Sequence, residues 1–315
     1  MPTYQILTGD SLTLLRQLPD NAVNCCITSP PYWQQRDYGC AGQLGLEATP
    51  SEYVANLTEI FREVRRVLTR DGTLWLNLGD TYFGDSPVRK RAADAFSQQW
   101  DRSQTRSRGG RRRSAKSVEG LKKKDLVGIP WRVALALQQD GWYLRSDIIW
   151  AKSNVMPSSV KDRPTPAHEY LFLLTRSANY YYDQDAILEP LAPGSAERYR
   201  YRFGGAKLER LKSDKRTAMV GFRSPTRGRN KRTVWTVPPS RSRHAHAATF
   251  PPQLVEPCVL AGCPESGLIL DPFNGTGTTA LVALAHHRNY LGLELNPKYV
   301  KITHHRLATE IFTAL

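Results

Sequence analysis

Seven short apolar runs, spread along almost the whole chain, limit the folds that this sequence can adopt. They cover residues 4–8, 23–27, 73–78, 147–150, 170–174, 267–270 and 290–293. They are rich in β-branched and aromatic residues and several show little alternation, which is typical of strands covered on both faces. Helix-forming stretches lie between them, at residues 51–68, 131–139, 278–287 and 297–310, and the turn signal at residues 69–72 ends the first of these. Alternating strands and helices predict a doubly wound α/β fold with a mostly parallel sheet.

The net charge of +15 is concentrated in two segments. Residues 85–124 hold 13 basic and 4 acidic residues, and residues 197–243 hold 15 basic and 3 acidic residues, so the remainder of the chain is net negative. The second segment also interleaves arginines with aromatic residues. Such segments are typical of a polyanion-binding enzyme, in which arginines contact phosphates and rings stack on bases. The alternative is a pair of solvated basic loops without a partner.

Composition excludes several other classes of protein. No run of 18 apolar residues is present, so no membrane-spanning helix is expected. The N-terminus lacks the pattern of a signal peptide, so we expect a cytoplasmic protein, associated with the nucleoid if its source is bacterial. The five cysteines are odd in number and lack zinc-ligand spacing, so neither disulfides nor a metal site is expected. Cys25 and Cys26 lie in an apolar run, where we expect them to be small core residues.

The apolar run at residues 267–270 leads into a glycine-rich turn and then a helix. Gly275 and Gly277 allow the backbone to approach a ligand closely, and the helix start offers free amide donors. Glu294 ends the next apolar run, where a carboxylate can accept hydrogen bonds from both hydroxyls of a ribose. The turn therefore predicts a nucleoside-containing cofactor, although a dinucleotide site would usually have three glycines. The alternative is an ordinary strand-to-helix turn followed by a surface glutamate.

A second motif, Ser29-Pro30-Pro31-Tyr32, directly follows another apolar run. The prolines fix an extended backbone and remove two amide donors, so a serine hydroxyl and a rigid carbonyl can together accept hydrogen bonds from an amino group. Tyr32 and Trp33 offer faces on which a flat ring can stack. The alternative is a proline-rich turn, or a ligand for a proline-recognising domain. If the strands before the two motifs are neighbours in an open α/β sheet, both motifs face one crevice.

Together these motifs resemble those of the beta class of DNA amino-methyltransferases, whose catalytic and cofactor motifs are circularly permuted. Ser29-Pro30-Pro31-Tyr32 resembles the catalytic tetrapeptide, and Phe273-x-Gly275-x-Gly277 resembles the S-adenosylmethionine loop. Residues 246–251 resemble the segment that helps hold the methionine part of the cofactor, and Gly9-Asp10 resembles the acidic position that contacts its adenine ring. The resemblance implies a seven-stranded sheet with an antiparallel hairpin at one edge. It implies S-adenosylmethionine as cofactor, and the candidate cofactor-binding residues are Asp10, Thr28, Thr249, Phe250, Asp271, Phe273, Asn274, Gly275, Gly277, Thr278 and Glu294.

The resemblance also implies direct methyl transfer to an exocyclic amine of a base in duplex DNA. Ser29 and the Pro30 carbonyl would accept hydrogen bonds from the amine, with Pro31 and Tyr32 completing the catalytic set. The base must leave the duplex to reach such a pocket and would stack on Tyr32, with Trp33 as a second face. Serine at the first position favours the 4-amino group of cytosine, and the 6-amino group of adenine is the alternative. Residues 168–170 resemble a family segment near the target pocket, or else are a surface pair at a strand edge.

Two other classes of function stay open. One is a methyltransferase that acts on RNA or on a protein amide, although a glutamine-modifying enzyme would usually carry asparagine before the two prolines. The other is a non-catalytic DNA-binding protein of the same fold.

The domain organisation follows from the motifs and the two basic segments. We expect the catalytic half at residues 1–84, a basic insertion at 85–125, the continued methyltransferase domain at 126–190, a target-recognition segment at 191–243 and the cofactor-binding half at 244–315. The insertion is expected to act as a second DNA clamp. The residues expected to bind DNA are Trp33, Arg198, Arg200, Arg202, Arg223, Arg227, Arg229, Lys231 and Arg232. The expected partners are duplex DNA, a cognate restriction endonuclease and a second copy in a homodimer.

Overall fold

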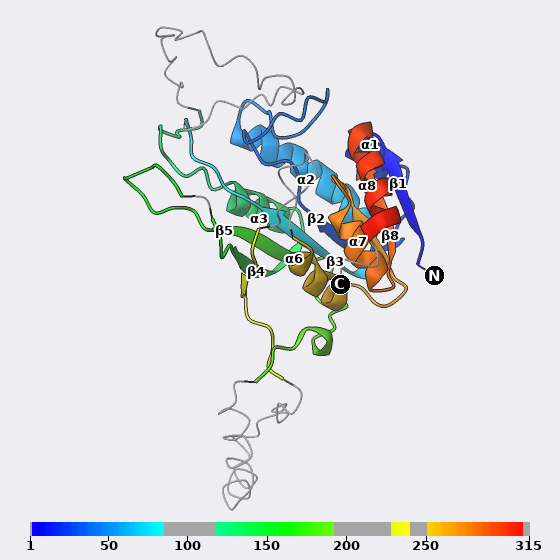
Figure 1. Ribbon diagram of the computed structural model, residues 1–315. Helices are drawn as coiled ribbons and strands as arrows, with labels where there is room; N and C mark the ends of the chain where they lie inside the picture. The colour runs from blue at the N-terminus through cyan, green and yellow to red at the C-terminus, as the bar shows by residue number, and fades with distance from the viewer. Residues whose placement is uncertain (1, 85–117, 156, 192–227, 240–250, 311–315) are drawn as a thin grey trace, which may run out of the picture. The chain divides into compact units, whose positions relative to one another are not determined.

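A mixed β-sheet forms the centre of the larger of two compact units (Figure 1). The computed structural model describes residues 2–84, 118–155, 157–191, 228–239 and 251–310. The larger unit comprises Met1–Tyr182 and Thr233–Leu315, and the smaller unit is Asp183–Arg232. The fold class is therefore the predicted α/β arrangement with a mostly parallel sheet.

Among the described residues, the sheet of the larger unit has eight strands in the order β1-β8-β7-β2-β3-β5-β4-β6. Only β5 runs against the others, because it pairs antiparallel with both β3 and β4 while every other pairing is parallel. The strands are β1 (Tyr4–Thr8), β2 (Val23–Thr28), β3 (Leu68–Leu78), β4 (Tyr143–Ala151), β5 (His168–Thr175), β6 (Val234–Thr236), β7 (Leu268–Asp271) and β8 (Asn289–Glu294).

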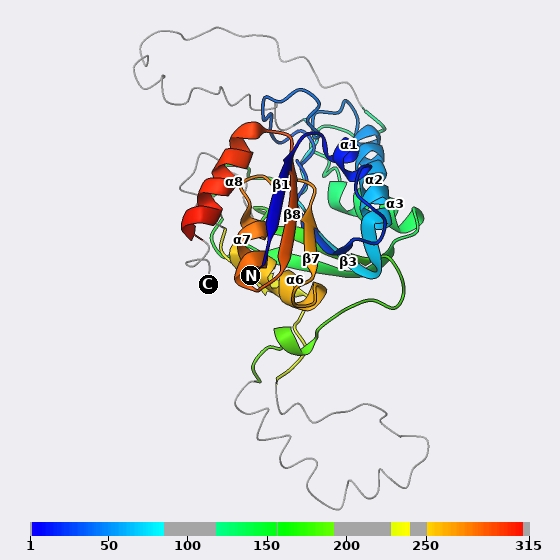
Figure 2. The ribbon, with the colours of Figure 1, turned by 90° about the vertical axis from the view of Figure 1, so that its right-hand side faces the viewer.

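Helices cover both faces of this sheet (Figure 2). One face carries α1 (Ser11–Leu15), α2 (Pro50–Val67) and α3 (Ile129–Gln139), which contact one another, and the other carries α6 (Pro252–Gly262), α7 (Thr278–Ala285) and α8 (Pro297–Glu310). Helix α2 begins where Thr49 accepts a hydrogen bond from the Glu52 amide, with proline at the first helical position. Its side chains at helical spacing, such as Tyr53, Leu57 and Val64, are fully buried against the sheet.

The strands that precede the two motifs are neighbours, as expected. Cys25 and Cys26 of β2 pair in parallel with Ile269 and Leu270 of β7. Parallel strands end at the same edge of a sheet, so the residues after β2 and β7 come together there. The strands nearest the two ends of the chain also pair, because Tyr4–Thr8 lies beside Tyr290–Glu294 in register.

The sheet differs from the expected seven strands by one short addition. Strand β6 pairs with Ile149–Ala151 and takes the outermost place beside the β4–β5 hairpin, which is therefore not at the edge. It was not predicted because it has three residues, of which Val234 and Thr236 are exposed. Residues 69–72, expected to be a turn, belong to β3 at a register shift between the pairs Val23–Leu68 and Cys25–Thr73.

The core confirms the expected role of the adjacent cysteines, since Cys25 and Cys26 are fully buried. The five cysteines carry free thiols. No helix in the described part of the chain is long and apolar enough to cross a membrane. The same residues contain no group of three or more metal-ligating side chains.

The smaller unit contains a short 3₁₀ helix at Asp185–Ile187. Glu189 and Arg229 form an antiparallel bridge with backbone hydrogen bonds of 2.8 and 2.9 Å. The Glu189 carboxylate also accepts hydrogen bonds from the Nε atoms of Arg229 and Arg232, each at 3.1 Å. These two arginines therefore already have a carboxylate partner within their own unit.

Candidate active site

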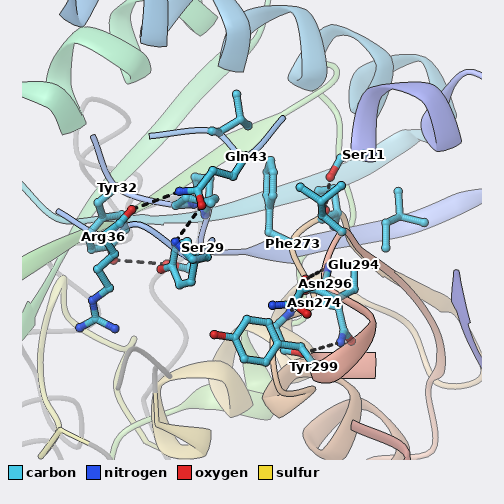
Figure 3. A pocket seen from close by; sticks show the side chains of 18 of the residues that line it. Ser11, Ser29, Tyr32, Arg36, Gln43, Phe273, Asn274, Glu294, Asn296 and Tyr299 are labelled. Atoms are coloured by element: carbon cyan, nitrogen blue, oxygen red, sulfur yellow. Dashed lines mark hydrogen bonds between the residues drawn. The ribbon is translucent and has the colours of Figure 1, made fainter. Parts of the chain in front are cut away.

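A cavity of about 390 Å³ lies at the carboxyl edge of the sheet, where the segments that follow β1, β2, β7 and β8 meet. Residues 29–32 line one side and residues 272–276 line the other, with Glu294 at the end of β8 (Figure 3). The two motifs therefore share one pocket, which follows from the adjacency of β2 and β7.

A buried hydrogen bond joins the strands that carry the two motifs. The Thr28 hydroxyl donates to Asp271 Oδ1 at 2.6 Å, and the Thr279 hydroxyl donates to Asp271 Oδ2 at 2.8 Å. The Phe273 amide donates to the same carboxylate at 3.0 Å. Asp271 therefore fixes the start of the glycine loop relative to the strand that precedes Ser29.

The Ser29–Tyr32 turn is held by α2, by the segment that precedes α2 and by the residue that follows β3. Tyr53 of α2 donates its hydroxyl to the Pro31 carbonyl at 2.8 Å. Gly45 has a φ of +93°, and a Cβ there would meet the Tyr32 carbonyl oxygen at 2.9 Å. Gly79 lies just as close to the Tyr32 ring, because a Cβ at this position would be 2.6 Å from Cε2. The absence of a Cβ at Gly45 and Gly79 thus lets the chain pack directly against Tyr32.

Five polar side chains that line the cavity converge at the turn. Ser29 donates to the Tyr32 hydroxyl oxygen at 3.3 Å, and Tyr32 donates to Glu169 Oε2 at 2.7 Å. The Nδ2 of Asn77 lies 2.5 Å from the Tyr32 oxygen, 3.0 Å from Glu169 Oε2 and 3.4 Å from Ser29 Oγ. The Lys152 ammonium forms an ion pair with the other oxygen of Glu169. Asn77 Oδ1 is buried and has no hydrogen-bond partner among the described residues.

The fold explains why these side chains meet, although they come from distant parts of the sequence. Asn77 lies at the end of β3, Lys152 directly follows β4, and Glu169 is the second residue of β5. Because β5 is antiparallel to β3 and β4, its beginning lies at the same edge of the sheet as their ends. Glu169 is opposite Trp150, so Lys152 reaches it from the adjacent strand.

The glycine loop is built around a buried carboxylate. Glu294 accepts hydrogen bonds from the Gly275 amide at 2.7 Å and from the Asn296 amide at 2.8 Å, one on each oxygen. Gly275 has a φ of +54°, and a Cβ there would meet only the Phe273 carbonyl oxygen, at 3.8 Å. Ser11 donates to the Pro272 carbonyl at 2.6 Å and ties the segment after β1 to this loop.

Burial raises the pKa of both carboxyl groups in this region. Desolvation raises the pKa of Glu294 to about 7, against the two amide hydrogen bonds, and the charge of Asp271 adds to the rise. Desolvation likewise raises the pKa of Asp271 to about 6, opposed by its hydrogen bonds from Thr28, Phe273 and Thr279. The carboxylate form of Glu294 is therefore in balance with its protonated form near neutral pH.

These features fit a nucleoside cofactor. Each Glu294 oxygen keeps acceptor capacity for a ribose hydroxyl, and the open space at the Gly275 Cβ position leaves room for the ligand next to the backbone. Phe273 and Leu295 add apolar lining beside them. The donor set holds no metal-ligand cluster in the described chain, and it suits hydroxyl and amino groups.

Comparison with known proteins decides the family. Residues 23–305 match the protein family described as DNA methylase, whose members transfer methyl groups to N6 or N4 of bases. The chain belongs to this family. It is therefore a DNA methyltransferase that uses S-adenosylmethionine. It is 44% identical over 310 residues to the Type II methyltransferase M.Cfr9I of Citrobacter freundii, covering 97% of this chain and 88% of the relative.

Other relatives support the same assignment. The Type II methyltransferase M.SmaI of Serratia marcescens is 40% identical over 305 residues, covering 96% of this chain and 90% of the relative. Among solved structures, the cytosine-N4-specific PvuII DNA methyltransferase has a TM-score of 0.64 at 19% identity, covering 96% and 86% of the two chains. The complex of M1.HpyAVI with S-adenosylmethionine has a TM-score of 0.52 at 15% identity, covering 97% and 100%. At these identities the two structures support the fold.

Ten of the fifteen candidate catalytic and cofactor-binding residues of this methyltransferase line the cavity. They are Asp10, Ser29, Pro30, Pro31, Tyr32, Phe273, Asn274, Gly275, Thr278 and Glu294. Thr28, Asp271 and Gly277 are not among the lining residues and act behind it, Thr28 and Asp271 through the buried hydrogen bond and Gly277 at the start of α7. Thr249 and Phe250 lie outside the described residues. Asp10 accepts hydrogen bonds from the backbone and side chain of Thr13, so one of its oxygens already caps α1.

The expectation that Trp33 offers a stacking face is wrong. Its side chain is buried in the core with 4% exposure, and its indole nitrogen donates to the Glu47 carbonyl at 3.0 Å. The chain turns after Tyr32, so the next side chain points away from the cavity. Its position next to the catalytic turn in sequence did not predict where its side chain lies, because successive side chains in an extended segment point to opposite sides.

The candidate DNA-binding arginines divide into two groups. Arg198, Arg200, Arg202, Arg223 and Arg227 lie outside the described residues, as do most of the insertion at 85–125 and residues 246–250. Arg229, Lys231 and Arg232 belong to the smaller unit, where Glu189 binds the two arginines.

Sequence reasoning did not identify Asn77 and Lys152 as site residues. Each lies at a strand end, and each is separated from Ser29 by many residues in sequence, so only the strand order brings them together. Glu169 lines the cavity, which agrees with the resemblance of residues 168–170 to a target-pocket segment rather than with a surface pair.

Proposed function

We propose that this methyltransferase belongs to the beta class and methylates the 4-amino group of cytosine at specific sites in duplex DNA. The observation that carries the proposal is that the Ser29 hydroxyl and the Ser29-Pro30 backbone face the same cavity as Gly275 and Glu294. The methyl donor and the amine that receives the methyl group would therefore bind in one pocket, at the ends of adjacent strands.

Direct methyl transfer needs hydrogen-bond acceptors for the amine, and it needs no nucleophile on the protein. The lone pair of an exocyclic amine is delocalised into its ring, so the amine is a weak nucleophile. Hydrogen bonds from its protons to Ser29 Oγ and the Pro30 carbonyl favour a tetrahedral nitrogen and stabilise the positive charge that develops on it. S-adenosylmethionine, when bound, supplies an activated methyl group. Glu294 and the glycine loop orient the cofactor, and the rigid proline turn orients the amine.

Two observations support cytosine over adenine. The first position of the tetrapeptide is serine, and the PvuII methyltransferase of similar fold is named as cytosine-N4-specific. The relatives named as Type II methyltransferases support site-specific DNA as the substrate and a partner restriction endonuclease. The target cytosine leaves the duplex to enter the cavity, and the Tyr32 ring, next to Ser29, is one of the aromatic faces that line it.

The test of this function is the identity of the methylated nucleoside. The purified protein is incubated with labelled S-adenosylmethionine and unmodified genomic DNA, which is then digested for mass spectrometry. Labelled 4-methylcytosine is expected. Labelled 6-methyladenine would overturn the choice of base, and label recovered only from RNA would overturn the choice of substrate.

The Ser29→Ala variant tests the catalytic role within the same assay. Removing the hydroxyl deletes one acceptor of the amine, so turnover should fall by about 10²-fold, as for loss of one preorganised hydrogen bond. Cofactor affinity, measured by calorimetry, should stay within a factor of two because the side-chain hydrogen bonds of Ser29 go to Tyr32 and Asn77, outside the glycine loop. A large loss of cofactor affinity would refute this division of roles.

A further inference from the structure

A one-way chain of hydrogen bonds leads from Ser29 along the wall of the cavity to Glu169, and all its members line the cavity. Ser29 donates to Tyr32 at 3.3 Å, and Tyr32 donates to Glu169 Oε2 at 2.7 Å. The far oxygen of Glu169 is paired with the ammonium of Lys152, which also lies over the Trp150 ring at 4.6 Å. Lys152 and Glu169 are only 22% and 16% exposed at the side chain.

The direction of this chain is fixed by its far end. Lys152 can only donate hydrogen bonds, and so can the Nδ2 atom of Asn77, so Glu169 must accept from both. The proton of Tyr32 therefore points toward Glu169. The Tyr32 oxygen must then accept, and it does so from Ser29 and Asn77.

This direction of the chain leaves the Ser29 oxygen able to accept a hydrogen bond in the cavity. Because the Ser29 proton is directed to Tyr32, and Asn77 Nδ2 uses at most one lone pair of the Ser29 oxygen, one lone pair remains for a donor in the cavity. Hydrogen bonds in a low-dielectric site polarise one another, so a serine backed by a tyrosine and a carboxylate is a stronger acceptor than an isolated serine.

We propose that Glu169 is a positioning residue for methyl transfer, which acts through Tyr32 and Ser29 and takes up the proton that the amine loses. The proposal rests on the function proposed above. As the new N–C bond forms and the donor's S–C bond breaks, one amine proton passes to Ser29 Oγ. The serine proton passes to the Tyr32 oxygen, and the tyrosine proton passes to Glu169 Oε2. The methylated base ends neutral, and the positive charge of the sulfonium is cancelled by the negative charge of Glu169.

The state of Tyr32 agrees with a relay. Burial, followed by the negative charge of Glu169, raises the pKa of the Tyr32 hydroxyl well above its ordinary value. Tyr32 therefore stays a phenol and gives up its proton only as it receives another. The competing explanation is that Lys152 and Glu169 only join β4 to β5, as any partly buried ion pair could.

Two isosteric variants and their combination separate these explanations. Glu169→Gln removes the charge and keeps the size, and Tyr32→Phe removes the hydroxyl and keeps the ring face. Each should lower the single-turnover rate by roughly 10²-fold, the lower range for positioned proton transfer. KM for DNA and the cofactor Kd should change less than twofold. The double variant should be no slower than the slower single variant, because both remove the same chain.

Glu63→Gln is the matched control. Glu63 is a partly buried glutamate, 21% exposed at its side chain, and it pairs with Arg66 at 2.8 Å on α2 outside the cavity. Its replacement should leave the rate unchanged. Melting temperatures of all four proteins identify any variant that is merely unfolded, and Tyr32→Phe keeps the test valid if Glu169→Gln fails to fold.

A second readout needs neither cofactor nor DNA. The protein is labelled with ¹³C at the tyrosine ring carbon that bears the hydroxyl, and the signal that vanishes in Tyr32→Phe identifies Tyr32. That signal should shift in Glu169→Gln, which loses the carboxylate acceptor, and should not move in Glu63→Gln. An unmoved signal, a wild-type rate in Glu169→Gln, or additive losses in the double variant would overturn the proposal. Absence of methylation by the wild-type protein would instead overturn the proposed function.

Discussion

At the residue scale, protonation of Glu294 has opposite effects on the stability of the fold and on cofactor binding. Its pKa of about 7 means that the folded protein favours the protonated form, so this group contributes stability that is present below its ordinary value of 4.5 and is lost as the pH rises through about 7. Cofactor binding has the opposite sign, because ribose hydroxyls and the amides of Gly275 and Asn296 are donors that need a carboxylate. Binding should therefore release a proton from Glu294.

Cofactor affinity should accordingly rise with pH. Between pH 5.5 and 7 the affinity should increase by up to about tenfold per pH unit, and it should level off above the pKa of Glu294. Titration calorimetry across this pH range measures the affinity. Because the buffer takes up the released proton, the enthalpy of binding should depend on the buffer used. Glu294→Gln is the control, because it isolates titration of the cofactor's own amino group. A wild-type profile parallel to that of Glu294→Gln would contradict the prediction.

Replacing Gly277 should mainly lower the stability of the fold, whereas replacing Gly275 should mainly lower cofactor affinity. Both have positive φ, but a Cβ at Gly277 would meet Thr303 Cγ2 at 2.5 Å, whereas the space at Gly275 is open toward the ligand. Gly277→Ala should therefore destabilise the fold by about 1–3 kcal/mol through overpacking and strain. Gly275→Val should abolish cofactor binding with a smaller loss of stability. Urea unfolding and calorimetry on both variants check the pair; retained cofactor affinity in Gly275→Val would place the cofactor elsewhere.

At the element scale, the hydrogen bond between Thr28 and Asp271 joins the two strands that carry the chemistry. Both side chains are 1% exposed, so Thr28→Val would leave Asp271 Oδ1 with one fewer donor in a dry environment. The expected cost is about 1–3 kcal/mol in the free energy of unfolding, measured by urea. Thr58→Val is the matched control, since Thr58 donates to a carbonyl of its own helix. Equal effects of the two changes would show that the inter-strand bond has no special weight.

Some elements could be predicted from the sequence to the residue, and others could not. Residues 4–8 and 297–310 have the bounds of β1 and α8, because Gly9 follows the first and Pro297 begins the second. Helix α6 was missed since it begins after Pro251 and holds Pro257 in its interior, a composition that resembles a loop. The site shows the same division. Motifs that are contiguous in sequence were found, whereas Asn77 and Lys152 depend on strand order that no local pattern encodes.

At the scale of the whole molecule, the excess positive charge lies in two segments of the chain. The part of the chain outside the two basic segments is net negative, yet its substrate is a polyanion, so we expect most of the DNA affinity to come from residues 85–124 and 197–243. Each cation that neutralises a phosphate releases a counterion and steepens the dependence of affinity on salt. The salt slope therefore counts the phosphate contacts that these segments make.

Replacing Arg198, Arg200 and Arg202 together with glutamine should weaken DNA binding and flatten its salt slope. Each phosphate contact contributes about 0.9 to the slope, so three contacts would reduce it by about 2.7. Binding is measured by fluorescence anisotropy between 50 and 200 mM salt, a range over which several lost contacts are resolved. Arg62→Gln is the control, because Arg62 is exposed but already paired with Asp140 on the helical face.

Comparison of two triple variants shows which of the two basic segments contacts DNA. The same replacement at Arg111, Arg112 and Arg113 tests the insertion independently. If only the first triplet flattens the slope, residues 197–243 bind the backbone and the insertion is not a clamp. If both do, both segments contact the DNA backbone. An unchanged slope in both would remove these arginines from the interface, and the acidic framework would then need another source of affinity for DNA.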